Sequence, residues 1–349
     1  MGSQGGFGSP YPITVLLAAA AVIAFGVASA LTAAFRRAAF AWGFLDRPNE
    51  RSSHEGIVPR GGGAALVLAV VSGLAVASGT WQWGPGVVAV LAGLALMSGV
   101  GLWDDRWGLS PWSRLLFQVI AAAAVVWAAG GLESAPLPPP LDVPLGLGPA
   151  LAVFWIVTVI NFYNFLDGID GLAGVQGLIT GAGLALAGWD PFSAACGAAV
   201  AGACGGFLLH NWAPARIFMG DVGSGALGFL LASAPLLAPG ARSRSVLFMA
   251  VSLWLFLADA TWTLARRVAR GERWHQAHRE HLYQRLVAQG WSHARVTTLI
   301  GLGSLVLTLL ALWAWRSGDT RWWWLSLAAA VVFFGIEIRL TRLRTPAGG

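Results

Sequence analysis

The residues that could do chemistry fall into four short polar clusters, each beside a long apolar stretch. The first is the pair Asp104 and Asp105, the second is the segment 161–170, the third surrounds Asp221, and the fourth is the segment 278–285. Acidic residues are costly in or beside a membrane, and those that persist there usually line a polar cavity, pair with another group or bind a cation. The four clusters are therefore candidate parts of a functional site.

The second and third clusters have the donor types that a hard divalent cation prefers. Asn161, Asn164 and Asp167 are three residues apart, so on a continuing helix they would line one face. Magnesium takes one or two carboxylates and completes its coordination with phosphate oxygens of a substrate. The glycines around Asp221, directly before an apolar stretch, suit backbone N–H groups that bind an anion at a helix start. These two clusters indicate a magnesium and phosphate site.

The fourth cluster adds positive charge and hydrogen-bond donors. His278, Arg279 and His281 suit a pyrophosphate, and arginine is the usual residue for a planar, bidentate grip on phosphate. The two histidines also have a spacing that can bind zinc, but no cysteine or further ligand accompanies them. We therefore expect a phosphate-binding role and no zinc.

The elements that position these clusters must lie in lipid. The chain is 56% hydrophobic and 11% charged, whereas charged residues make up about a quarter of a soluble chain. Cys196 and Cys204 lie in an apolar run and are interpreted as small packing residues. The composition and periodicity predict an all-α, polytopic helix bundle forming a single domain over 1–349. We expect eleven spans: 12–35, 62–80, 86–103, 114–130, 149–166, 171–188, 192–209, 224–238, 245–265, 296–315 and 322–340.

The arginines predict which side of the membrane each loop occupies. All 22 basic residues are arginine, and 18 of them fall in alternate loops and the tail from Arg339. The positive-inside rule places these loops in the cytoplasm, with the N-terminus outside and the C-terminus inside. All four polar clusters then lie on the cytoplasmic face of the inner membrane. Asp259, inside the ninth span, is expected to pair with Arg266, Arg267 or Arg270.

In the same order along the chain, the polar motifs resemble a known membrane family. The Asp-Asp pair, the Asn-x-x-Asn-x-x-Asp-Gly-x-Asp-Gly segment, the Gly-Asp-x-Gly-Ser segment and the His-Arg-x-His loop are similar to those of the polyprenyl-phosphate N-acetylhexosamine-1-phosphate transferases, glycosyltransferase family 4. That family includes phospho-MurNAc-pentapeptide translocase and the enzymes that initiate O-antigen and teichoic acid linkage synthesis. The segment 278–297 is most similar to the O-antigen-initiating branch and lacks the three consecutive histidines of the peptidoglycan enzyme.

The resemblance implies a reaction and a role for each matched residue. The reaction is transfer of an N-acetylaminosugar 1-phosphate from a UDP-sugar to undecaprenyl phosphate, with release of UMP. Asp221, with Asn164 beside it, would bind Mg²⁺, for which Mn²⁺ is a substitute. Asp104 and Asp105 would engage the lipid phosphate, and Asp167 is grouped with them as catalytic. The substrate-binding residues would be Asn161, Asp170, Phe218, His54, Arg60, His278, Arg279 and His281, with Phe218 against the uracil.

Several alternatives remain open from the sequence. The donor could be UDP-GlcNAc or a UDP-linked 6-deoxy aminosugar such as QuiNAc or FucNAc. A phospho-MurNAc-pentapeptide transferase of peptidoglycan synthesis is the alternative within the family, and an ion-coupled transporter is the alternative outside it. The expected partners are the two substrates, the lipid bilayer and a second copy of the chain in a homodimer. The arginines follow the spans, so no nucleic acid is expected.

Overall fold

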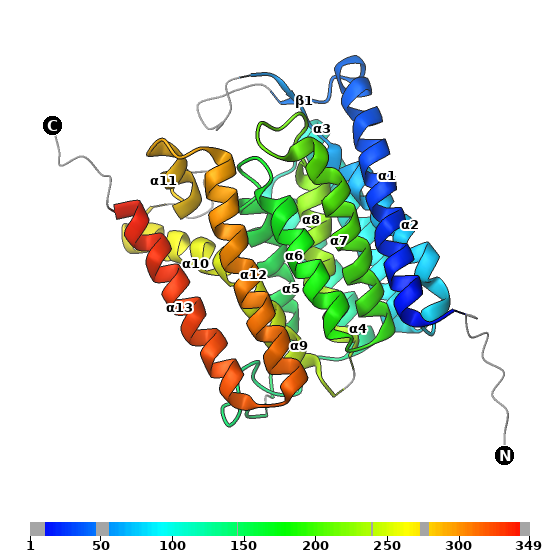
Figure 1. Ribbon diagram of the computed structural model, residues 1–349, viewed down its shortest axis with the longest axis vertical. Coiled ribbons are helices and arrows are strands. Elements are labelled where there is room, and N and C mark those ends of the chain that lie inside the picture. The colour runs from blue at the N-terminus through cyan, green and yellow to red at the C-terminus, as the bar shows by residue number, and fades with distance from the viewer. Residues whose placement is uncertain (1–10, 47–55, 145, 239, 273–278, 343–349) are drawn as a thin grey trace.

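The computed structural model describes residues 11–46, 56–144, 146–238, 240–272 and 279–342. Most of this is helix, as the composition predicts (Figure 1). The helices are α1 (Ile13–Trp42), α2 (Gly62–Ala77), α3 (Pro85–Trp107), α4 (Pro111–Ala129), α5 (Gly148–Phe165), α6 (Leu172–Ala187), α7 (Pro191–Asn211), α8 (Asp221–Ser233), α9 (Arg242–Ser252), α10 (Trp254–Ala269), α11 (Leu282–Ala288), α12 (His293–Ser317) and α13 (Thr320–Arg342). Two short strands, β1 (Leu45–Asp46) and β2 (Val58–Pro59), pair antiparallel beyond the end of α1.

The helices agree with a polytopic membrane protein. Among the described residues, eight helices are long and apolar enough to cross a membrane, and the pair α9 and α10 makes a ninth if it counts as one span. Two further apolar helices are shorter, namely α6 and the segment Asp221–Leu237 that begins with α8. Each of the eleven expected apolar segments falls on one of these elements.

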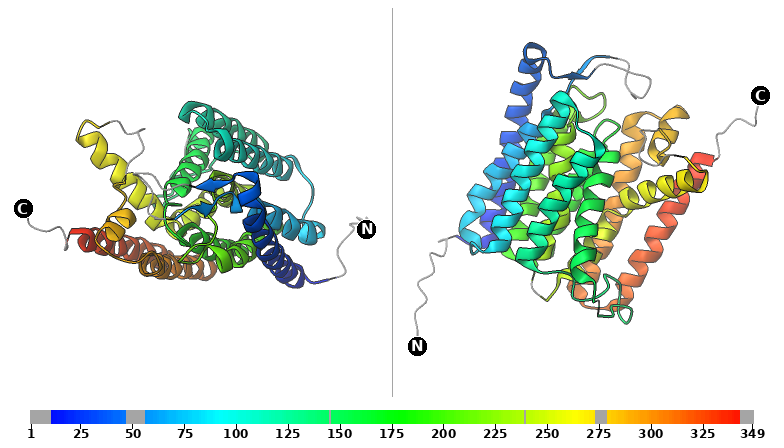
Figure 2. Two further views of the ribbon diagram at one scale, coloured as in Figure 1. Left: turned by 90° about the horizontal axis from the view of Figure 1, so that it is seen from above. Right: turned by 180° about the vertical axis from the view of Figure 1, so that it is seen from behind.

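The ninth expected span differs from the prediction. The segment 245–265 is not one straight helix, because α9 and α10 meet at a bend of 76°. The bend interrupts the hydrogen bonds within the helix and frees the Ser252 carbonyl. An unpaired polar group is costly in these apolar surroundings. Gln176 of α6 satisfies it, since its Nε2 donates to the Ser252 carbonyl at 2.9 Å, while its Oε1 accepts from Ser304 Oγ at 2.8 Å. Beyond the bend, α10 projects away from the main bundle (Figure 2).

Small residues let the central helices pack closely. A Cβ at Gly202 or Gly206 of α7 would overlap the backbone of α1, at Ala21 and Phe25. Backbone approach of this kind is a usual basis of helix association in a membrane, where burial of apolar surface offers little drive. Cys196 and Cys204 are fully buried in the same helix, in agreement with their predicted packing role.

The polar clusters meet at one end of this bundle. The end of α3, the end of α5, the start of α8 and the short helix α11 lie at the same end, and the described chain begins at the opposite end (Figures 1 and 2). The start of α8 is held against its neighbours by two further close approaches. A Cβ at Gly63 of α2 would overlap Gly223, and one at Gly101 of α3 would overlap Val222.

Candidate active site

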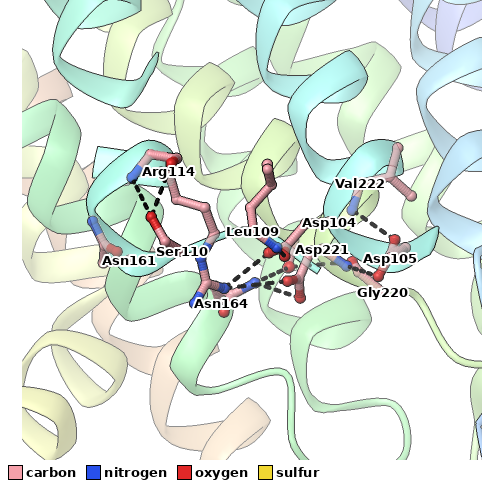
Figure 3. A network of polar contacts seen from close by, with 12 residues as sticks. Asp104, Asp105, Leu109, Ser110, Arg114, Asn161, Asn164, Gly220, Asp221 and Val222 are labelled. Atoms are coloured by element: carbon pink, nitrogen blue, oxygen red, sulfur yellow. Dashed lines mark hydrogen bonds and ion pairs between the residues drawn. The ribbon is translucent and has the colours of Figure 1, made fainter. Parts of the chain in front are cut away.

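Asp105 fixes the start of α8. Its side chain comes from α3 and is fully buried, and its two oxygens accept from the backbone N–H groups of Asp221 at 2.9 Å and Val222 at 3.1 Å. The first N–H groups of a helix have no partner within the helix, so a carboxylate there satisfies them and also interacts favourably with the helix dipole. Asp105 therefore positions the next residue of the site, Asp221 (Figure 3).

Asp221 is the centre of the polar network. Its Oδ1 accepts from Asn164 Nδ2 at 3.0 Å, and the Asp104 carboxyl lies within hydrogen-bonding range of its own carboxyl. Asn164 Nδ2 also donates to Ser224 Oγ at 2.9 Å, one turn further along α8. Residues from α3, α5 and α8 thus meet at one carboxylate (Figure 3).

Two arginines contact these acids, each at a different oxygen of Asp221. Arg60, just before α2, lies 2.9 Å from Asp105 Oδ1 and 3.4 Å from Asp221 Oδ1. Arg114, in the first turn of α4, lies 2.9 Å from Asp104 Oδ2 and 3.4 Å from Asp221 Oδ2. Both side chains are about one-third exposed, at 35% and 36%. They can therefore also reach an anion brought to the site from solvent.

Asp167 joins the cluster from the turn after α5. The helix ends at Phe165, so the continuing helix on which Asn161, Asn164 and Asp167 would share a face does not extend to Asp167. Burial raises the pKa of Asp167 well above its usual range, Asp221 and Asp105 raise it further, and Arg60 acts in the opposite direction. The Asp167 carboxyl therefore interacts electrostatically with the acids of the site.

A cavity of about 530 Å³ opens next to the network. Asp104, Arg114, Asn164 and Asp221 form its polar end. Most of the rest of the wall is apolar and comes from α3, α4, α5 and α10, including Met97, Val100, Leu115, Val157, Ile160, Phe162 and Leu264. Such a cavity suits a molecule with a charged group at one end and a hydrocarbon part at the other.

Asn161 lies on the wall of the cavity in an amide pair. Its Nδ2 donates to Gln118 Oε1 of α4 at 2.6 Å and to the Val157 carbonyl at 2.8 Å. The pair joins α4 to α5 and places a neutral polar group within the apolar part of the cavity.

The fourth cluster reaches the same cavity through His281. Its ring lines the cavity, and it directly precedes α11. Tyr283 then joins α11 to α5 by donating to the Phe165 carbonyl at 3.0 Å. A Cβ at Gly168 would overlap the Tyr283 hydroxyl, so the glycine in the Asp-Gly-x-Asp-Gly segment makes room for this contact. Asp259, which was expected to pair with an arginine, instead contacts His281 at 3.2 Å.

Asp170, Phe218 and Arg279 are described but do not line the cavity. Asp170 accepts from the Ala215 N–H at 3.0 Å and lies 3.3 Å from His293, so it joins the turn after α5 to α12. Phe218 is half-buried, and its backbone pairs with Pro59 and Gly62. Arg279 is exposed. His54 and His278 are outside the described residues.

The arrangement also includes groups that the sequence did not single out. In the sequence, Arg114 is one of the arginines of the loops that are expected in the cytoplasm. It lies in the first turn of α4, the helix that follows the Asp-Asp pair, and hence at the same membrane face as the pair. Gln118 lies one turn further along α4, on the same side as Arg114. Arg114 and Gln118 lie on the helix after the one that carries Asp104, so helical spacing from the acids does not mark them in the sequence.

The donors at the polar end fit a magnesium ion. Two carboxyl groups in contact, such as Asp104 and Asp221, are stable together only when a proton or a cation offsets their repulsion. Within the described part of the chain, no three acidic, histidine or cysteine side chains form a metal cluster of their own. One or two carboxylates with further oxygens from phosphate and water are the usual environment of magnesium.

A helix bundle of this kind, with acids and arginines at the charged end of an apolar cavity, defines a polytopic membrane protein whose cavity suits a molecule with a polar and a lipid part. Comparison with known proteins identifies the family. The model of glycosyl transferase family 4 matches residues 87–238. The matched segment contains α3 to α8 and hence Asp104, Asn164 and Asp221. With the relatives described next, this match shows that the chain belongs to glycosyl transferase family 4.

Curated relatives cover most of the chain. It is 30% identical over 289 residues to a probable undecaprenyl-phosphate N-acetylglucosaminyl 1-phosphate transferase of Bacillus subtilis, covering 81% of this chain and 80% of the relative. It is 32% identical over 306 residues to decaprenyl-phosphate N-acetylglucosaminephosphotransferase of Mycobacterium tuberculosis, covering 74% and 73%. A phospho-N-acetylmuramoyl-pentapeptide-transferase of Synechococcus is 34% identical over 231 residues, covering 59% and 60%.

Proposed function

We propose that this protein transfers an N-acetylaminosugar 1-phosphate from a UDP-sugar to undecaprenyl phosphate. An oxygen of the lipid phosphate attacks the phosphorus attached to the sugar, the bond from that phosphorus to the UMP oxygen breaks, and UMP leaves. The products are UMP and undecaprenyl-pyrophosphate-sugar. The observation that carries the proposal is the cavity, whose charged end contains Asp104, Arg114 and Asp221 and whose walls are apolar.

Asp221 would hold Mg²⁺, with Asn164 beside it, and Mn²⁺ would be a substitute. When bound, the ion would neutralise charge on the transferring phosphoryl group. Phosphoryl transfer depends mainly on positioning and on neutralising charge. Arg60 and Arg114 supply positive charge at the two carboxylate oxygens of Asp221. Asp104 is the candidate to accept a proton from the lipid phosphate, since it both lines the cavity and contacts Asp221.

The donor sugar is proposed from the family resemblance and the relatives. UDP-GlcNAc is the first candidate, because the relatives from Bacillus and Mycobacterium carry N-acetylglucosamine in their names. UDP-QuiNAc and UDP-FucNAc are also candidates, and the segment 271–296 is the proposed determinant of the choice. The product would initiate a surface polysaccharide such as O-antigen at the cytoplasmic face of the inner membrane. The Synechococcus relative supports phospho-MurNAc-pentapeptide transfer as the second candidate.

The test is UMP release by the purified full-length protein in detergent. The reaction contains undecaprenyl phosphate, Mg²⁺ and one donor from a panel of UDP-aminosugars that includes UDP-MurNAc-pentapeptide. We expect release that requires the lipid phosphate and the metal and that is lost in Asp221→Ala. Asp319→Ala is the matched control, because the Asp319 carboxylate pairs with Arg321, at the opposite end of the bundle from the site, and with no other side chain among the described residues. Absence of release with every donor, from folded protein, would favour the transporter alternative.

A further inference from the structure

Asp259 is a buried acid of α10 whose contacts the proposed reaction does not use. It is 1% exposed and accepts four hydrogen bonds from protein groups. Its Oδ1 accepts from Leu282 N at 2.9 Å and from Thr263 Oγ1 at 3.1 Å, and it lies 3.2 Å from His281 Nδ1. Its Oδ2 accepts from Tyr283 N at 3.3 Å. One side chain of α10 therefore binds both the start of α11 and the histidine that precedes it.

The contact with Asp259 determines which ring nitrogen of His281 can act in the cavity. An ionised carboxylate only accepts hydrogen bonds, so His281 Nδ1 carries the proton in this pair. The choice of protonated nitrogen in a histidine is generally set by the hydrogen bond that the other nitrogen makes. With Nδ1 committed to Asp259, any contact of the ring with a molecule in the cavity is made through Nε2. The ring is only 4% exposed, so its orientation is closely constrained.

A second buried acid, Glu337, lies near Asp259 but differs from it in its hydrogen bonds. Glu337 of α13 is 6% exposed and electrostatically close to Asp259. Both Glu337 carboxyl oxygens are buried without a hydrogen-bond partner among the described residues. Two adjacent buried carboxyl groups cannot both be ionised without a large cost. Asp259 accepts four hydrogen bonds, on both carboxyl oxygens, whereas Glu337 accepts none from the described residues, so Asp259 is the acid that is built into this part of the fold.

We propose that Asp259 is a positioning residue for the transfer reaction, acting through His281. It holds Nδ1 of the imidazole and the first turn of α11, and thereby directs Nε2 towards a phosphate or sugar oxygen in the cavity. The inference rests on the proposed function, because it names a group that orients one of the proposed substrate-binding residues. The Tyr283 contact with Phe165 holds the other side of α11 and keeps the histidine beside the end of α5.

The first experiment compares isosteric variants in the UMP-release reaction. Asp259→Asn keeps the shape of the side chain and removes its charge, and we expect a turnover about 10- to 100-fold lower, the usual effect of losing a group that orients an active-site residue. Asp259→Asn in a His281→Gln background should lose nothing further, because residues that act as a unit are not additive. An additional loss of the same factor in that background would overturn the proposal.

Two matched controls separate positioning from folding. Thr263→Val removes another hydrogen bond to the same carboxylate without touching His281, and Glu337→Gln makes the same acid-to-amide change on the neighbouring acid. We expect both to keep turnover within about twofold of the original protein, since neither changes the histidine. A loss in either control equal to that of Asp259→Asn would show that general disruption of this region, and not orientation of His281, explains the effect.

The second experiment does not depend on activity. In protein labelled with ¹⁵N at its histidines, the resonances that disappear in His281→Gln identify His281. We expect them to report protonation at Nδ1 in the original protein and a changed tautomer in Asp259→Asn. The same tautomer in both would overturn the inference. If no donor gives UMP release, the proposed function fails, whereas the tautomer measurement still decides whether Asp259 orients His281.

Discussion

Asp104 and Asp105 are neighbours in sequence but have different surroundings. Asp105 uses both oxygens to bind the start of α8, whereas Asp104 lines the cavity and contacts Asp221. The adjacency and the shared helix end were visible in the sequence, but the distinction was not. It depends on which of two consecutive side chains faces α8, and only the packing of α3 against α8 decides that.

Arg114 is the residue whose importance the structure most increases. Its removal would leave Asp104 and Asp221 in contact without the guanidinium that lies 2.9 Å and 3.4 Å from them. A hydrogen bond to a charged group is worth about 1.5–3 kcal/mol. We therefore expect kcat/KM for UMP release to fall about 10- to 100-fold in Arg114→Ala, with partial recovery in Arg114→Lys.

The control for that prediction is Arg106→Ala, an exposed arginine at the end of α3 that stacks on Phe44 and does not line the cavity. Equal activity of Arg114→Ala and Arg106→Ala would remove Arg114 from the reaction.

At the scale of the elements, α8 is held in place by small residues on several sides. The sequence showed glycines before an apolar stretch and so suggested an anion at the helix start. The structure instead supplies a carboxylate of the protein, Asp105, at the first two N–H groups. The glycine motif alone cannot distinguish these cases, because both need a close approach to the same backbone.

Gly220 is expected to be the most sensitive of these glycines. Its φ is +76°, which disfavours other residues, and a Cβ there would lie 2.6 Å from Asp105 Oδ2. Gly220→Ala should lower the thermal unfolding temperature of the detergent-solubilised protein and also its activity, since Asp221 is the next residue. The expected loss is about 1–3 kcal/mol from strain together with the displaced carboxylate.

Gly99→Ala is the comparison, because Gly99 is in helix α3 and nothing lies within 4 Å of a Cβ at that position. Unchanged stability of Gly220→Ala would mean that the stability of the protein does not depend on the observed position of the Asp105 carboxylate.

The bend between α9 and α10 is the main element that could not be predicted. The residues Val251–Trp254 contain neither proline nor glycine, so no local signal marks a break. Gln176, which satisfies the break, and Ser304, which holds Gln176, are both distant from it in sequence. The bend matters to the site because α10 then carries Leu264 to the cavity and Asp259 to His281.

For the whole molecule, the apolar segments predicted the helices because each segment needs enough length to cross lipid. The motifs likewise indicated which segments meet, and Asp104, Asn164, Asp221 and His281 do line one cavity. The shape of that cavity was not predictable, since it depends on how α4, α5 and α10 are arranged around it.

The burial of both cysteines in α7 has a practical consequence. Cys196 and Cys204 are the only thiols of the chain and are 0% exposed. We therefore expect the unmodified protein not to react with water-soluble maleimides. A cysteine introduced by Ser317→Cys or Ala288→Cys, at opposite ends of the bundle, becomes a unique reporter of the compartment it faces. We expect an impermeant maleimide to label Ser317→Cys in intact spheroplasts and Ala288→Cys only after lysis, and the reverse pattern would invert the proposed orientation.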